Sequence, residues 1–240
     1  MLQMEDTMIF SFFGLFGGKK PALKLKEKQE IEIEFYTEES GYETHFTHVL
    51  DIQRKSVIVK SPGTERRPIR VIPGQRMTVT TLDNNILYTF ETQVLDAGER
   101  EFDIKPPENV QEEKQPSFDE NCQIEVPITV EYRAMNSAHH QVAQTYAITN
   151  TGLILMTNLP IPSGTTLKLE IEIPGAMGFS TTGNVIGSKA HPNDKKKHLC
   201  EIEYVDLSKQ DINSILRYAL YSKKRLERKA KRDELDAMSK

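Results

Sequence analysis

Residues 126–152, VPITVEYRAMNSAHHQVAQTYAITNTG, decide the fold of the second half of this chain. Apolar and polar side chains alternate over 124–133, and a period of two predicts a β-strand with one face in a core. A polar connection, a second strand over 141–148 and a turn ending at Gly152 follow. We therefore expect any site in this half to lie at the ends of these two strands.

Further strand patterns complete a second domain over residues 121–206. They cover 153–157, 167–173, 179–188 and 197–204, with turn residues between them. With the first pair they predict a six-stranded all-β unit, in which lysines 195–197 lie at a hairpin tip.

The first half, residues 23–104, is also rich in strand patterns. Residues 30–35 alternate strictly, and four more patterns cover 44–52, 56–59, 75–80 and 86–95. Short strands at this spacing predict a barrel or sandwich. The predicted fold class is therefore all-β, with two β-barrel domains in tandem and a C-terminal α-helix. The densest basic cluster of this half comprises Arg66, Arg67, Arg70 and Arg76. We expect it to lie in a solvated loop; the alternative is a patch that binds an anion or an acidic partner.

Residues 105–120 have the composition of an interdomain linker. The segment 105–119 holds three prolines, four acidic residues and two apolar side chains, which cannot form a core. We expect it to let the two domains reorient.

The C-terminal segment, residues 207–240, is the one predicted helix. Ser208 and Asp211 form a capping box, and an apolar stripe that should pack on a barrel follows at Ile212, Ile215, Leu216, Ala219 and Leu220. Seven cations over 223–232 are interpreted as a solvated tail, with contact to an acidic partner as the alternative.

Composition indicates a soluble protein in a reducing, cytoplasmic setting. The formal charge of −4 gives no global attraction for nucleic acid, and two cysteines form neither a disulfide framework nor a metal cluster. The apolar run 8–16, rich in Phe, lies in an expected N-terminal tail over 1–22 and lacks signal-peptide charges. Packing on its own domain is favoured for this run, and contact with a membrane surface or a partner is the alternative.

No set of residues in the sequence predicts catalysis or metal binding. His139 and His140 are adjacent, so on a strand they point to opposite faces, and His45 and His48 have no third ligand nearby. Cys122 is interpreted as a small strand residue, with a redox role as the alternative. We expect neither an enzyme nor a resident cofactor or metal.

The order of motifs in the second half resembles a PilZ domain. It comprises the strand pair, Thr-x-x-Gly, PIPSGTTLKLEI, EIEYVDL and a helix that begins DINSILRY. The first half, with IPGQRMTV and YTFETQVL, is similar to the domain that precedes PilZ in flagellar-brake proteins. The resemblance covers about residues 23–232. It implies a non-enzymatic protein that binds cyclic di-GMP between its domains and signals to a flagellar motor or another protein.

This chain departs from the family's ligand motif, which is Arg-x-x-x-Arg followed by Asp/Asn-x-Ser-x-x-Gly. Ungapped counting places the two arginines at Ser117 and Asn121, and the second motif at Ala147, Thr149 and Gly152. The arginines and the acidic residue are absent, while a hydroxyl and the glycine remain. Guanidinium forks grip phosphates bidentately, so we expect cyclic di-GMP recognition to be weakened or lost.

Two functions follow from the resemblance. The first is a PilZ-family adaptor that acts on a protein partner, such as a flagellar motor or surface-assembly component. The alternative is a cyclic di-GMP effector with an atypical site, whose remaining donors are Lys114, Arg133, Thr149 and Gly152.

Overall fold

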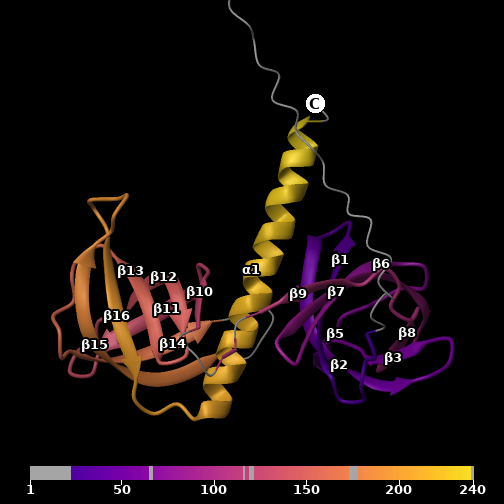
Figure 1. The fold of residues 1–240 in the computed structure, drawn as a ribbon, viewed down its shortest axis with the longest axis horizontal. Helices are drawn as coiled ribbons and strands as arrows, with labels where there is room; N and C mark the ends of the chain where they lie inside the picture. Colours follow the sequence, from indigo (N-terminus) through magenta and orange to yellow (C-terminus); the bar gives the residue numbers. More distant parts are fainter. Residues whose placement is uncertain (1–22, 65–66, 116, 119–121, 173–177, 239–240) are drawn as a thin grey trace, which may run out of the picture.

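The computed structural model describes residues 23–64, 67–115, 117–118, 122–172 and 178–238. Two β-barrels stand side by side, and a long helix, α1 (Lys209–Met238), rises between them (Figure 1). The predicted fold class is confirmed. The expected tail over 1–22, with its apolar run, lies outside the described residues.

The first barrel is closed by six antiparallel strands in the order β6-β1-β2-β3-β8-β7, with β6 pairing back onto β7. Its larger strands are β1 (Glu30–Thr37), β2 (Gly41–Ile52), β3 (Val57–Lys60), β6 (Arg76–Asp83), β7 (Ile86–Ala97) and β8 (Glu101–Ile104). A two-stranded ribbon, β4 (Gly63–Thr64) and β5 (Arg67–Pro68), lies between β3 and β6 in the chain. The alternation in β1 places Ile31, Ile33 and Phe35 in the barrel core.

The second barrel repeats this plan, with the order β12-β11-β14-β15-β16-β13 closed by the pairing of β12 with β13. Its strands are β11 (Thr129–Ala134), β12 (Gln141–Thr149), β13 (Gly152–Thr157), β14 (Thr166–Glu172), β15 (Phe179–Ala190) and β16 (His198–Tyr204). The six-stranded unit that the sequence predicted is therefore present.

Two local predictions differ from the structure. The single strand expected over 124–133 is interrupted at Pro127, which has no N–H for a ladder, giving β10 (Gln123–Glu125) and then β11. Both pieces pair with β12, and Thr145 spans the gap: its hydroxyl accepts a hydrogen bond from Ile128 N at 2.9 Å and donates one to Val126 O. In the expected linker, residues 111–114 form β9 (Gln111–Lys114), an added strand on β7.

Helix α1 joins the two barrels. Ser208 caps its start, because the Ser208 hydroxyl accepts a hydrogen bond from Asp211 N at 3.1 Å. The buried face comprises Ile215, Leu216, Ala219, Leu220, Tyr221 and Ser222. Its apolar members belong to the core of the second barrel, and Leu87 of the first barrel is part of the same cluster. The predicted stripe thus packs on the second barrel and also reaches the first.

Tyr221 is the buried aromatic residue at this junction. Its side chain is fully buried, its hydroxyl accepts a hydrogen bond from Leu82 N at 3.0 Å, and its ring lies 5.5 Å from that of Phe46. Burial is the main cause of a raised pKa for this phenol.

We expect the protein to lose stability in alkali partly through Tyr221. Because the folded-state pKa lies above the unfolded value near 10, the folded state keeps a proton that the unfolded state has lost. Stability is therefore full below pH about 10 and falls above it by up to about 1.4 kcal/mol per pH unit for this group. Urea unfolding from pH 9 to 11 should show a smaller fall for Tyr221→Phe, whereas Tyr36→Phe, on an exposed side chain, should match the unmodified protein.

No helix in the described part of the chain has the length and apolar character of a membrane span.

Candidate functional site

Thr149 and Gly152 form the turn between β12 and β13. The Thr149 hydroxyl accepts hydrogen bonds from Gly152 N at 2.9 Å and Thr151 N at 3.3 Å, and lies 3.1 Å from Gly152 O, to which it donates. The hydroxyl that survives from the family motif is therefore used to close its own turn. This is the local bonding that Thr favours at turns.

Gly152 is required by the packing of the second barrel. It pairs with Glu203 of β16, and a Cβ atom built on it would lie 1.8 Å from the carbonyl oxygen of Ile202. No side-chain rotation relieves a clash with a backbone atom. Strand packing therefore explains why a glycine stands at position 152, without reference to any ligand.

We expect Gly152→Ala to destabilise the second barrel severely, because β13 and β16 must separate to admit the methyl group. The loss should exceed the 0.5–3 kcal/mol of a typical substitution, as judged by urea unfolding. Gly187→Ala is the matched control, because Gly187 also lies in a strand and nothing lies within 4 Å of its added Cβ. A Gly152→Ala protein as stable as this control would contradict the close approach of β16.

Ala147 takes the acidic position of the family motif and is fully buried. It lies in β12 between Glu125 of β10 and Ile154 of β13. An ionised carboxylate placed here without a partner would incur a large desolvation cost. The structure therefore holds a small apolar residue where the motif has a base-binding acid.

The linker positions add no cation. Ser117 is partly buried and Asn121 lies outside the described residues. Gln123 of β10, three residues beyond the expected linker, pairs with Thr149. Between residues 115 and 132 the sequence has no Arg or Lys. The linker itself consequently supplies no guanidinium to grip a phosphate.

The other donors of the atypical site do not gather around the turn. Arg133 follows Tyr132, which pairs with Gln141 at the far end of β12 from Thr149. Eight residues of strand correspond to about 26 Å at ~3.3 Å per residue. Arg133 instead donates to Ser137 O at 3.2 Å, and Lys114 lies exposed on β9 at the edge of the first barrel.

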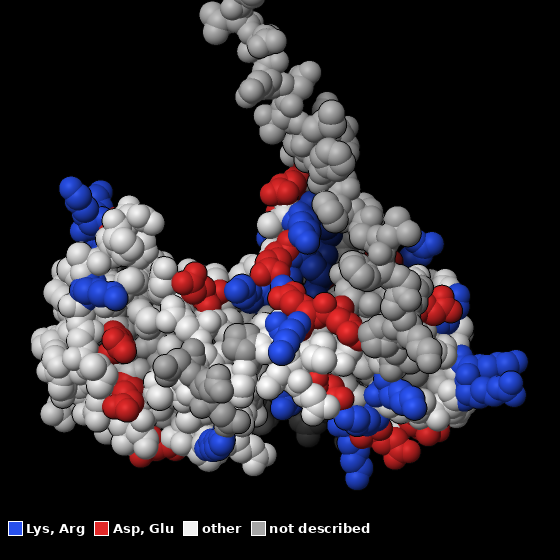
Figure 2. Space-filling view, viewed as in Figure 1, with Lys and Arg blue, Asp and Glu red and all other residues white. Residues whose placement is uncertain are grey.

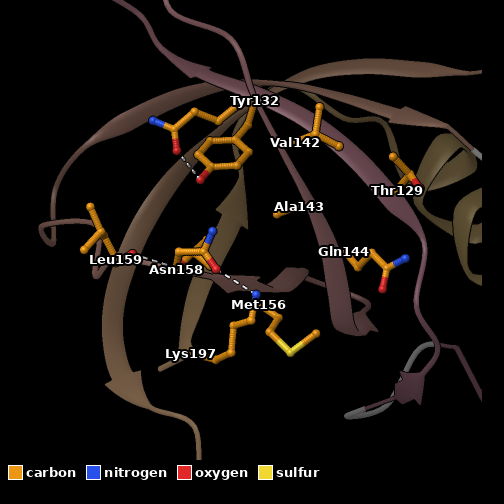
Figure 3. A pocket seen from close by; sticks show the side chains of 11 residues that line it. Thr129, Tyr132, Val142, Ala143, Gln144, Met156, Asn158, Leu159 and Lys197 are labelled. Carbon is orange, nitrogen blue, oxygen red and sulfur yellow. Dashed lines mark hydrogen bonds between the residues drawn. The ribbon is translucent and has the colours of Figure 1, made fainter. Parts of the chain in front are cut away.

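A cavity of about 450 Å³ opens at that far end of the second barrel (Figure 3). Lys197 donates to the Asn158 side-chain oxygen at 2.7 Å across it, and Tyr132 donates to Gln141 at 2.7 Å. None of the five motif positions lines it. The sequence indicated Lys197 only as part of a hairpin tip. Nothing in the sequence pattern indicated that the side-chain amides of Asn158 and Gln141 line a cavity.

Buried ion pairs join α1 to β1, and they show that one prediction was partly wrong. The basic segment after Tyr221 was expected to be a solvated tail, yet Arg228 bonds to Glu34 at 2.7 Å, to Glu32 at 2.9 Å and to Thr80 at 3.0 Å. Arg232 forms a second ion pair with Glu34. The side chains of Glu32 and Glu34 are 0% and 2% exposed. Arg228 and Arg232 are therefore docked on the first barrel, because the acidic face of β1 attracts them, whereas Lys229 and Lys231 of the same segment are exposed as predicted.

Figure 2 shows charged side chains intermingled along α1 and the adjoining first barrel, and fewer on the visible face of the second barrel.

Burial raises the pKa of Glu32, and Arg228 opposes that rise. Glu30, which lies on the same face of β1, accepts a hydrogen bond from Tyr218 at 3.0 Å. The sequence signal for this contact was acidic residues at every second position of β1 together with arginines four apart in the helix.

The remaining candidates have local partners. His140 pairs with Glu131, and His45 lies 3.1 Å from Glu43. Within the described residues, no three His, Cys, Asp or Glu side chains are grouped to hold a metal. Cys122 is buried, and burial raises the pKa of its thiol, which disfavours the reactive thiolate.

The predicted basic cluster of the first half is described only in part. Arg70 and Arg76 are exposed, but the segment is not a single loop, because Arg67 belongs to β5 and Arg76 begins β6. Arg66 lies outside the described residues.

Comparison with known proteins identifies the first barrel. Residues 26–104 match the family profile PilZNR, described as flagellar protein YcgR. This match confirms the resemblance of the first barrel to flagellar-brake proteins that its sequence motifs predicted. A search of curated protein sequences gave no match.

Several solved structures match most of the length of this chain. The inhibitor of motility MotI/DgrA of Bacillus subtilis has 15% identity and a TM-score of 0.37, over 83% of this chain and 98% of that one. YcgR of Escherichia coli in complex with c-di-GMP has 14% identity and a TM-score of 0.37, over 88% of each chain. The MrkH–c-di-GMP complex of K. pneumonia has 12% identity and a TM-score of 0.37, over 85% and 90%.

Proposed function

We propose that this protein is a non-enzymatic regulatory adaptor of the PilZ type, in which recognition of cyclic di-GMP at the family's motif positions is weakened or lost. It acts in the cytoplasm by contact with a protein partner, a component of a flagellar motor or of surface assembly. The family of the first barrel supports this class of protein. The tandem arrangement of two barrels with a C-terminal helix is consistent with it.

The chemistry of the motif positions carries the proposal. The hydroxyl of Thr149 is used within its own turn, Gly152 is needed for strand packing, and Ala147 offers no acceptor side chain. Hydrogen bonds to charged groups contribute about 1.5–3 kcal/mol each. Two absent phosphate-binding arginines alone therefore weaken binding by roughly two to four powers of ten.

The alternative, an effector with an atypical site built from the remaining donors, is less well supported. Arg133 lies on β11 next to Tyr132, which pairs with Gln141 at the end of β12 remote from Thr149, and this separation argues against one ligand held by both residues. Lys114 is a single ammonium group and does not reproduce two guanidinium forks.

Calorimetric titration with cyclic di-GMP tests the proposal. We expect no heat of binding at micromolar nucleotide, because the motif positions present no cation. Binding with a micromolar or lower dissociation constant would refute the loss of recognition.

A further inference from the structure

The charged cluster between α1 and β1 has one more guanidinium than its buried carboxylates use. Arg228 and Arg232 hold Glu32 and Glu34, whereas the partly buried Arg225 donates one hydrogen bond, to Ser222 Oγ at 3.0 Å. Among the described residues, no carboxylate forms an ion pair with Arg225. Its charge acts on Glu32 only through space. This guanidinium is therefore available to a further anion.

Arg225 lines a cleft where both barrels meet α1. The cleft has a volume of about 360 Å³ and is bordered by Tyr42 and Thr44 of β2, by Pro127 and Ile128 between β10 and β11, and by Ser222, Arg225 and Leu226 of α1. Arg225 is the single charged residue among these. The volume lies within the range of small-molecule sites, which occur preferentially at domain interfaces.

The other groups of the cleft suit an oxyanion with an apolar part. The side chains of Tyr42, Thr44 and Ser222 each carry a hydroxyl, which can donate to an anion. Pro127 and Leu226 supply exposed apolar surface, and Leu226 is 43% exposed. A phosphate has more oxygen acceptors than a carboxylate, so a guanidinium group beside several hydroxyl groups favours phosphate.

A second cavity of about 520 Å³ also borders on Tyr42, Thr44 and Arg225 and extends along α1. It adds the cations Lys229 and Arg232 and also carries the carboxylates of Glu34, Asp233 and Asp236. The acidic residues do not line the inner cleft. An anion is therefore favoured in the inner cleft, next to Arg225.

We propose that this cleft binds a small phosphate-bearing molecule, with its phosphate on the guanidinium of Arg225 and its apolar part against Pro127 and Leu226. Such a ligand contacts both barrels and α1 at once, and so stabilises their arrangement. None of the five family-motif positions lines the cleft, so the inference does not depend on the proposed function.

Inorganic phosphate is the probe for this site. We expect millimolar phosphate to broaden its own ³¹P resonance in the presence of the full chain, and to raise the thermal midpoint relative to chloride at equal ionic strength. Both effects should disappear in Arg225→Met and persist in Lys231→Met, an exposed cation of the same helix that does not line the cleft. Arg225→Lys keeps the charge without the fork and should bind at least tenfold more weakly.

Three results would overturn the proposal. These are no broadening in the unmodified protein, equal broadening in Arg225→Met and the unmodified protein, and an equal midpoint shift with acetate. Circular dichroism in chloride checks that each variant is folded, and Arg225→Lys replaces Arg225→Met if the latter is not.

Discussion

Arg228→Met is expected to lower the free energy of unfolding by about 3–5 kcal/mol, because it leaves two buried carboxylates without their main partner. The guanidinium of Arg228 contacts Glu32, Glu34 and Thr80 at once, and the two glutamates are almost fully buried. Arg232 remains on Glu34, but Glu32 loses the one cation that is hydrogen-bonded to it among the described residues. Urea unfolding at neutral pH measures the change.

Lys231→Met is the matched control for this prediction. Lys231 is exposed on the same helix segment and has the same change of side chain, so its effect should stay within about 0.5 kcal/mol. Adding Glu32→Leu and Glu34→Leu to Arg228→Met should recover much of the loss, because removing a buried pair is milder than breaking it. If Arg228→Met and Lys231→Met are equally stable, α1 does not dock on β1 as described.

Restoring the two arginines is expected to create cyclic di-GMP binding. In Ser117→Arg with Asn121→Arg, the new forks would lie near the β12–β13 turn, since the strand that follows the linker pairs with Thr149. Two to four hydrogen bonds to phosphate should improve the dissociation constant by at least a hundredfold, into the micromolar range. Titration calorimetry measures the gain.

Lysines at the same two positions provide the control, because they add the same charge without bidentate geometry. The lysine variant should bind at least tenfold more weakly than the arginine variant. Failure of a folded arginine variant to bind would contradict the alignment of the linker with the family motif. Ala147→Asp completes the motif, but its buried position should lower stability by a few kcal/mol, so it is best added last.

Alternation of side chains predicted most of the strands, and the reason is visible in β1. Ile31, Ile33 and Phe35 fill the barrel because successive side chains of a strand point to opposite faces. The same rule left Glu32 and Glu34 on the outer face, which the pattern alone assigns to water. They are buried because α1, almost two hundred residues later in the sequence, covers that face.

The turn at Thr149 and Gly152 was predictable from the sequence, whereas the contacts that these residues make were not. The motif order placed Thr149 and Gly152 at a turn, and they do form one. The sequence did not reveal that Gly152 lies against the carbonyl of Ile202, because this contact depends on the register between β13 and β16. The break at Pro127 also depends on a distant residue, Thr145, whose hydroxyl satisfies the freed backbone groups.

Titration calorimetry of the unmodified protein with cyclic di-GMP tests the central claim most directly. It should be run at moderate salt beside the Ser117→Arg, Asn121→Arg variant, which serves as the positive control. We predict no heat of binding for the unmodified protein and clear binding for the variant. Heat of binding in the unmodified protein at micromolar nucleotide would contradict the account and show that other residues recognise the nucleotide.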